Sequence, residues 1–252
     1  MLKNSHFLAF DTSTDVMSVA LTNGSSVWQH TGPGGAKSST TLIPAILSLL
    51  QEAGLTLTEL DAIAFGRGPG SFSGLRTACA VAQGLAFGAG QGVGVPVLPI
   101  DTLMVVAEEA RFQTLDQADV PHITAMLDAR MNEMYVQRYT YTQGVFMPLS
   151  SCILVGPEHL EPEAATLYAG NVFDVYAGRL PKGLSSITCL PAATAMLRLA
   201  PALAASGHCI KPALALPLYV RDKVALTTEE RELVKTLKSQ ASPDSNQAPV
   251  SP

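Results

Sequence analysis

Charged side chains are scarce in this chain of 252 residues. Asp, Glu, Lys and Arg account for 15% of the sequence and hydrophobic residues for 47%, whereas an average soluble domain is roughly 25% charged. This composition excludes intrinsic disorder for most of the chain, because the apolar residues are numerous enough to form a core. Lys and Arg number 16 against 21 Asp and Glu, which argues against a broad cationic face that would bind nucleic acid unaided.

The usual spacings of metal-binding and redox-active residues are also missing. The four cysteines form no C-x-x-C pair and the five histidines form no H-x-x-x-H pair, so the sequence predicts no metal site made by this chain. The apolar run before Asp11 covers only residues 7–10, which is too short for the core of a signal peptide. We therefore expect a reducing, cytoplasmic location.

One stretch without charge, residues 77–100, is long enough on paper to cross a bilayer. Five glycines and Pro96 interrupt it, and such residues break a long helix. We interpret the stretch as the end of a soluble helix followed by a buried strand over residues 95–100, and we expect no membrane contact.

Hydrophobic periodicity predicts an α/β fold. Asn23-Gly24 lies between two apolar runs and is a strong hairpin signal, so the chain is expected to open as an antiparallel meander. Apolar residues at helical spacing predict a helix over residues 41–53 that ends at Gly54. Next come a short buried strand, a glycine-rich loop over residues 66–74 and a second helix over residues 73–86. This second helix is lined with small residues.

The pattern of the first strands recurs later in the chain. Residues 7–21 and 124–139 both consist of an apolar strand, an Asp, a polar turn and a second strand, with Asp11 matching Asp128. The recurrence suggests two lobes of shared ancestry, with coincidence as the alternative. Carboxylates on two rigid strand ends would suit a Mg²⁺-nucleotide cleft between lobes, but strand-end turns also use Asp without any function.

The glycine-rich loop also has two interpretations. Its glycines could free backbone N–H groups to bind a phosphate at a helix N-terminus. The loop lacks the Gly-Lys-Ser/Thr of a Walker A motif and the third glycine of a dinucleotide fingerprint. A tight structural turn capped by Ser71 or Ser73 explains it equally well.

Four segments, taken together, resemble one known family. They are Asp-Thr-Ser-Thr at residues 11–14, Gly-Arg-Gly-Pro-Gly-Ser-Phe-Ser-Gly-Leu-Arg at 66–76, Leu-Asp-Ala-Arg-Met-Asn-Glu-Met-Tyr at 127–135 and Pro-Leu-Tyr-Val-Arg at 217–221. In this order they resemble the bacterial TsaB (YeaZ) family, the dimerisation subunit of the tRNA N6-threonylcarbamoyladenosine (t6A) transferase machinery, over roughly residues 6–225.

The resemblance implies the two-lobed α/β fold of actin, Hsp70 and sugar kinases, with duplicated mixed-sheet lobes. We expect an N-terminal lobe over residues 1–103, onto which residues 208–226 pack back, and a second lobe over residues 104–207. A capping box at Thr227 and Glu230 predicts a C-terminal helix over residues 227–238. Residues 239–252, rich in Pro and Ser, are expected to be a disordered tail.

The resemblance also implies that the catalytic residues lie on a partner subunit. The related TsaD carries a His-x-x-x-His metal site, and Thr102 and Val106 stand where its histidines would be. Residues 11–14 contain no glycine that would let a backbone close on a phosphate. We expect no tightly bound cofactor on this chain, with ATP and metal on the partner subunits, and a degenerate nucleotide cleft formed by Asp11, Thr12, Ser13, Thr14, Gly68, Gly70, Asp128, Arg130 and Gly170.

By resemblance, TsaB pairs with TsaD through the two N-terminal helices of each protein, TsaE joins the assembly with ATP, and tRNA is met only through the complex. A homodimer through the same helices is the alternative assembly. Many relatives carry a His near position 38, where this chain has Ser38. The expected contact residues are Leu42, Ile46 and Leu49 on the first helix and Ser73, Arg76, Ala80, Gln83, Gly84 and Phe87 on the second.

The leading hypothesis is a non-catalytic scaffold subunit that helps TsaD move a threonylcarbamoyl group from threonylcarbamoyl-AMP to N6 of adenosine 37, in tRNAs that read codons beginning with A. A stand-alone ATP-dependent kinase or transferase of the same fold is the second hypothesis, which measured ATP turnover would favour. A metallopeptidase is the third, and metal analysis of the purified protein would distinguish it.

Overall fold

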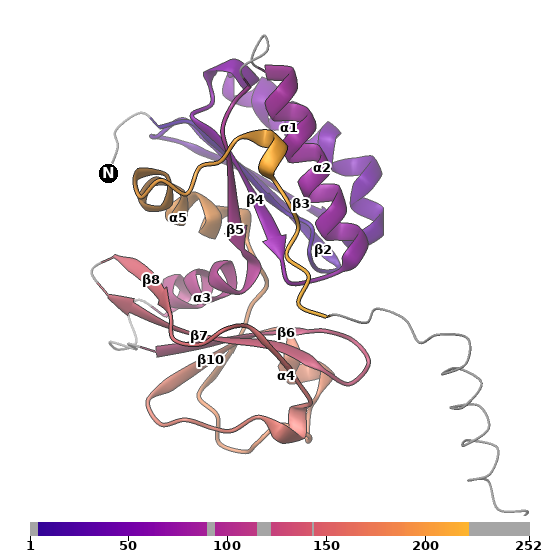
Figure 1. The fold of residues 1–252 in the computed structure, drawn as a ribbon, viewed down its shortest axis with the longest axis vertical. Helices are drawn as coiled ribbons and strands as arrows, with labels where there is room; N and C mark the ends of the chain where they lie inside the picture. The colour runs from indigo at the N-terminus through magenta and orange to yellow at the C-terminus, as the bar shows by residue number, and fades with distance from the viewer. Residues whose placement is uncertain (1–4, 90–93, 115–121, 143, 222–252) are drawn as a thin grey trace, which may run out of the picture. The chain divides into compact units, whose positions relative to one another are not determined.

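The computed structural model describes residues 5–89, 94–114, 122–142 and 144–221 (Figure 1). The first of its two mixed sheets has the order β3-β2-β1-β4-β5. β1 pairs with β2 in antiparallel fashion and with β4 in parallel, and β2 pairs with β3, so the predicted meander is confirmed. The strands are β1 (Phe7–Asp11), β2 (Val16–Thr22), β3 (Val27–Pro33), β4 (Ala62–Gly68) and β5 (Val97–Asp101).

The second sheet repeats this topology. Its order is β11-β10-β6-β7-β8, with β9 on the edge of β7, and β6 is antiparallel to β7 but parallel to β10. Asp11 and Asp128 therefore end equivalent strands, and the duplicated, two-lobed α/β fold is confirmed. The strands are β6 (His122–Asp128), β7 (Met134–Thr142), β8 (Val145–Pro148), β9 (Ile153–Val155), β10 (Thr166–Gly170) and β11 (Ser186–Thr188).

The two N-terminal helices form close to where the sequence predicts them. The helix predicted over residues 41–53 begins earlier, because a 3₁₀ turn (Gly35–Lys37) leads into it and the Ser38 hydroxyl donates to the Gly35 carbonyl (2.6 Å). Gly54 ends it with φ 66°, in the left-handed region that glycine tolerates. The helices are α1 (Ser38–Ala53), α2 (Phe72–Ala89), α3 (Thr102–Gln113), α4 (Val172–Val175) and α5 (Ala193–Ala205).

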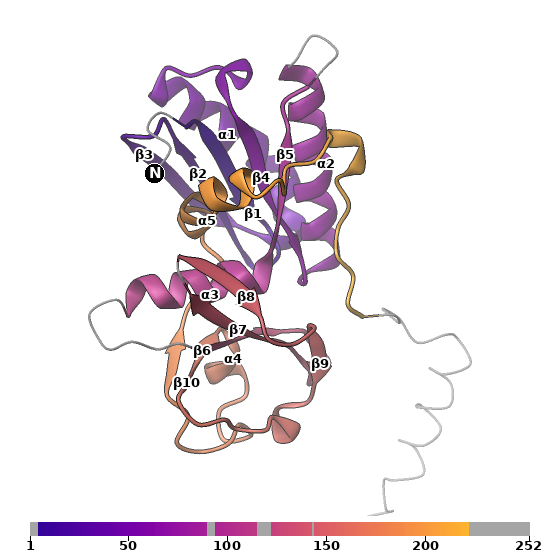
Figure 2. The same ribbon diagram turned by 60° about the vertical axis from the view of Figure 1, so that its left-hand side comes forward.

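Alternate side chains of β1 enter two different cores. Leu8 and Phe10 pack beneath α1 and α2, whereas Phe7 and Ala9 belong to a cluster that includes α3, α5 and residues of both sheets. Figures 1 and 2 accordingly show α1 and α2 on one face of the first sheet and α5 on the other. The small side chain of Ala9 is suited to the close approach of α5 to β1.

Two segments after the second sheet return to the first. α5 lies within the range expected for the second lobe, yet it packs mainly against β1, β2 and α3. Ile210 then exchanges two backbone hydrogen bonds with Val97 of β5, and residues 212–220, which we call the strap, run along α2 (Figures 1 and 2). The strap begins with the 3₁₀ turn η4 (Pro212–Leu214). The predicted helix and tail after residue 226 lie outside the described residues.

No helix in the described part of the chain is both long enough and apolar enough to span a membrane.

Candidate functional site

The carboxylate of Asp11, expected at the centre of a nucleotide cleft, is bound by the chain itself. Oδ1 accepts hydrogen bonds from the amide (2.8 Å) and the hydroxyl (2.6 Å) of Ser13, and Oδ2 accepts one from Thr102 Oγ1 (3.2 Å). Complete burial raises the pKa of Asp11 above its usual range, although these hydrogen bonds lower it in part. The side chain that we considered as a Mg²⁺ ligand is thus packed inside the protein.

The glycine-rich loop fits tightly against the turn that follows β1. A Cβ atom at Gly66 would overlap the Asp11 side chain, and one at Gly70 would overlap Ser13. Thr12 Oγ1 donates to the carbonyl of Gly74 (2.7 Å) at the start of α2. The glycines therefore allow close approach of the chain's own backbone, which supports the structural-turn interpretation over a phosphate loop.

The remaining cleft residues also serve local packing. Asp128 Oδ1 accepts hydrogen bonds from the Arg130 amide (2.9 Å) and the Tyr176 hydroxyl (2.7 Å). The Arg130 guanidinium forms an ion pair with Asp15 (2.8 Å) and so joins the turns that follow β6 and β1. A Cβ atom at Gly170 would overlap the Met126 carbonyl on the neighbouring strand.

Thr14 and Gly68 complete the expected set. The Thr14 hydroxyl donates to the carbonyl of Val16 at the start of β2 (3.0 Å), and a Cβ atom at Gly68 would overlap the Leu218 carbonyl of the strap. Of the first-lobe members, Asp11, Ser13 and Gly70 thus pack against one another, whereas Thr12, Thr14 and Gly68 contact residues outside the set.

The two positions that the resemblance aligns with the TsaD histidines lie inside the protein. Thr102 and Val106 are both fully buried near the start of α3. Within the described ranges, no three side chains among His, Cys, Asp and Glu are close enough to hold a metal ion.

The expected contact residues of α1 require a correction. Leu42, Ile46 and Leu49 are buried in the core beneath α1 and α2, so they cannot meet a partner. The amphipathic pattern that predicts the helix marks the side that packs on the chain's own sheet. The apolar side chains that α1 exposes are instead Ile43 (43%) and Leu47 (51%).

The expected residues of α2 mostly lie on its outer side. Ser73, Arg76, Ala80, Gly84 and Phe87 are exposed, and Phe87 is 54% exposed. The sixth, Gln83, is half-buried because its amide donates to the Ala215 carbonyl of the strap (3.1 Å). We call the exposed residues Ile43, Leu47, Ala80, Gly84 and Phe87 the helix face.

Two glycines on the outer side of α2 are not required by the packing of the residues that the structure describes. A Cβ atom at Gly84 or at Gly88 would meet nothing within 4 Å. Glycine inside a helix costs roughly 0.5–1 kcal/mol relative to alanine. With Ala80 they form a stripe of small residues at four-residue spacing, which would allow another backbone to approach closely.

The helix face is also nearly without charge. α1 contains one charged residue, Glu52, and α2 contains one, Arg76. Exposed apolar surface of this kind marks protein–protein contact sites, whose centres are depleted of charge.

Comparisons with known proteins agree on one family. The family model for TsaD, the tRNA N6-adenosine threonylcarbamoyltransferase, matches residues 30–206. The "tRNA threonylcarbamoyladenosine biosynthesis protein TsaB" of Haemophilus influenzae is 35% identical over 88% of this chain and 96% of its own length. The Escherichia coli protein of the same name is 32% identical over 86% of this chain and 95% of its own length. The solved structure of YeaZ from Pseudomonas aeruginosa superposes with a TM-score of 0.76 at 36% identity, covering 85% of this chain and 99% of that protein.

Proposed function

The chain belongs to the TsaB (YeaZ) family of tRNA threonylcarbamoyladenosine biosynthesis proteins, and from this premise we propose that it is a non-catalytic partner subunit of TsaD. TsaD would transfer the threonylcarbamoyl group from threonylcarbamoyl-AMP to N6 of adenosine 37 in tRNAs that read ANN codons. TsaE would join the assembly, ATP and metal would be held by the partner subunits, and tRNA would be met only through the complex.

The observation that carries this proposal is the helix face. Large apolar side chains and a stripe of small residues are exposed on two adjacent helices that share only two charged residues. A surface of this composition is expected to be covered by another protein. The buried state of Asp11 supports the non-catalytic part, because the chain's own donors already use both carboxylate oxygens.

The test places a long cation where a partner backbone should approach. Ala80→Arg and Gly84→Arg would each bury an unpaired charge at the contact, and this costs several kcal/mol. We expect both variants to stay folded by circular dichroism and to lose co-elution with TsaD in size-exclusion chromatography. Folding should survive because both positions face away from the chain's own core.

Ala202→Arg is the matched control, since Ala202 is an exposed helical alanine on α5. It should bind TsaD as the wild type does. If the two α2 variants stay folded and still co-elute with TsaD, the contact lies elsewhere and the proposal is wrong.

A further inference from the structure

The strap is hydrogen-bonded to α2 at its middle and near its far end. The buried Ala215 carbonyl accepts hydrogen bonds from Cys79 Sγ (3.2 Å) and Gln83 Nε2 (3.1 Å). At the far end of the strap, the Tyr219 hydroxyl accepts a hydrogen bond from Arg76 Nε (3.1 Å). These contacts fix an otherwise irregular segment in one position along the helix.

Two further contacts anchor the strap where α2 begins. The Leu218 amide donates to the Arg67 carbonyl of β4 (2.7 Å). The Tyr219 ring lies 5.3 Å from the Phe72 ring, centroid to centroid, and the Arg76 guanidinium covers the Phe72 ring at 3.9 Å. The aromatic and cationic side chains at this end are therefore used to hold the strap.

The strap exposes one leucine on each side of the buried Ala215. Leu214 is 61% exposed and Leu216 is 69% exposed, and Leu216 is the most exposed large apolar side chain in the described ranges. Ala215 between them is fully buried and its carbonyl is bound to α2, so the strap is held at Ala215 and exposes the side chains of both neighbours. Residues 212–220 contain no charged residue.

The strap adjoins the helix face directly. Cys79 and Gln83, which hold it, precede Ala80 and Gly84 by one residue each, and consecutive helix residues are about 100° apart around the axis. Both ribbon views show the strap beside α2 (Figures 1 and 2). α1, the outer side of α2 and the strap thus form adjoining parts of one surface that is poor in charge.

We propose that the strap is the third element of the partner-binding surface, and that Leu214 and Leu216 contact the same subunit that covers the helix face. This inference rests on the proposed function. The occupant is an uncharged, apolar surface of the partner, because a charged group placed over these leucines would be desolvated without a counter-ion. The strap would then extend the partner contact beyond α1 and α2, the two helices that the family resemblance implies.

The test compares two pairs of exposed apolar residues in the full-length chain. Leu214→Ser combined with Leu216→Ser should raise the Kd for TsaD about tenfold or more, as expected when two well-covered anchors are truncated. Val145→Ser combined with Met147→Ser is the control, because these β8 residues are 44% and 57% exposed on the second sheet. It should leave the Kd unchanged, and both pairs should keep the wild-type melting temperature.

The outcomes separate this inference from the proposed function. If Gly84→Arg abolishes binding while the strap pair binds as the wild type, the strap inference is overturned and the helix face stands. If Gly84→Arg also binds normally, both are overturned. A strap pair that weakens only a homodimer, seen by sedimentation of the isolated chain, would assign the strap to a second copy and contradict the inference. Equal loss in the strap pair and the control pair would contradict it as well.

Discussion

The Asp11 carboxylate is buried with neutral donors only. Its three hydrogen bonds come from one amide and two hydroxyls, and burial raises its pKa. A folded-state pKa above the unfolded value means that the folded protein holds the proton more tightly than the unfolded chain. The contribution of Asp11 to the free energy of unfolding should therefore be largest below the pKa of Asp in the unfolded chain, about 3.9. This contribution should be lost as the pH rises through the pKa of Asp11 in the folded protein.

Asp11→Asn should remove this pH dependence. The amide keeps an oxygen for Ser13 and offers an N–H group to Thr102 Oγ1, which can accept it. We expect urea denaturation between pH 4 and pH 8 to show a flatter profile and a larger free energy of unfolding at pH 7 than for the wild type. Asp174→Asn, at an exposed position, should keep the wild-type profile. An Asn variant that is less stable at pH 7 would show that the carboxylate is needed in its charged form.

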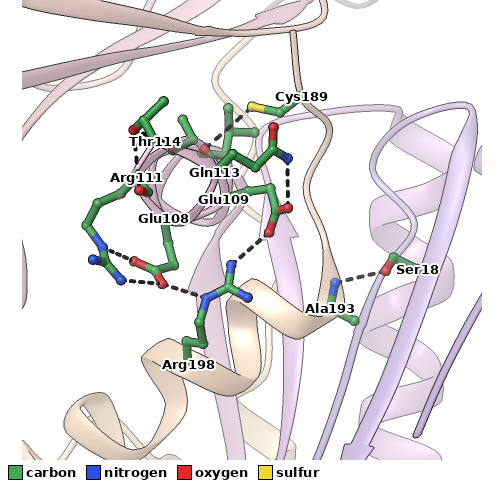
Figure 3. A network of polar contacts seen from close by, with 11 residues as sticks. Ser18, Glu108, Glu109, Arg111, Gln113, Thr114, Cys189, Ala193 and Arg198 are labelled. Atoms are coloured by element: carbon green, nitrogen blue, oxygen red, sulfur yellow. Dashed lines mark hydrogen bonds and ion pairs between the residues drawn. The ribbon is translucent and has the colours of Figure 1, made fainter. Parts of the chain in front are cut away.

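At the scale of elements, one buried carboxylate joins α3 to α5 (Figure 3). Glu108, which is 2% exposed, is paired with Arg111 on its own helix (2.7 Å) and with Arg198 on α5 (2.7 Å). Arg198 also reaches Glu109 (2.7 Å). Since α3 packs on β6 of the second sheet and α5 on β1 of the first, this network ties the two lobes together.

Glu108→Ala should destabilise the protein strongly. It would leave two largely buried guanidinium groups with their shared partner removed, a change that costs on the order of 3 kcal/mol or more. Thermal and urea unfolding would measure it. Glu158→Ala breaks an ion pair with Arg179 in which both side chains are well exposed and should change stability little. A similar decrease in the free energy of unfolding in the two variants would mean that the α3–α5 network stabilises the protein no more than an exposed ion pair does.

The elements also show how far the sequence predicts this structure. Hydrophobic periodicity and the Asn23-Gly24 turn predict the meander and both N-terminal helices within a few residues. The partner contact expected from the resemblance included Leu42, Ile46 and Leu49, which form the regular apolar stripe of α1, and such a stripe marks the side that a helix turns toward its own sheet. Ile43 and Leu47, which α1 does expose, lie outside that stripe.

The strap could not be predicted from local pattern. Residues 212–220 have no helical or strand periodicity, and their position depends on hydrogen bonds to residues more than 100 positions earlier in the chain. The role of the glycine-rich loop could not be predicted from the sequence either. Whether glycines surround a ligand or a neighbouring backbone depends on which segment lies opposite, and here residues 11–13 lie opposite.

At the scale of the whole molecule, the isolated chain should bind Mg-ATP weakly or not at all. The turn that follows β1 and the glycine-rich loop, which are the segments considered for phosphate binding, pack against each other through Asp11, Ser13 and the loop glycines. Isothermal titration calorimetry of the isolated chain should give no Kd in the low micromolar range. The same titration of the complex with TsaD and TsaE checks the assay, and a low micromolar Kd for the chain alone would revive the stand-alone enzyme.

Gly84 and Gly88 make α2 in the free protein less stable than alanines would at the same positions, by roughly 0.5–1 kcal/mol each. A partner that binds only the folded chain offsets that loss by mass action. Copies of the chain that are not bound by a partner should therefore open locally more often and be degraded sooner than bound copies. Under the proposed pairing with TsaD, unbound copies would then be cleared selectively, and this clearance would bring the amounts of the two proteins in the cell closer together.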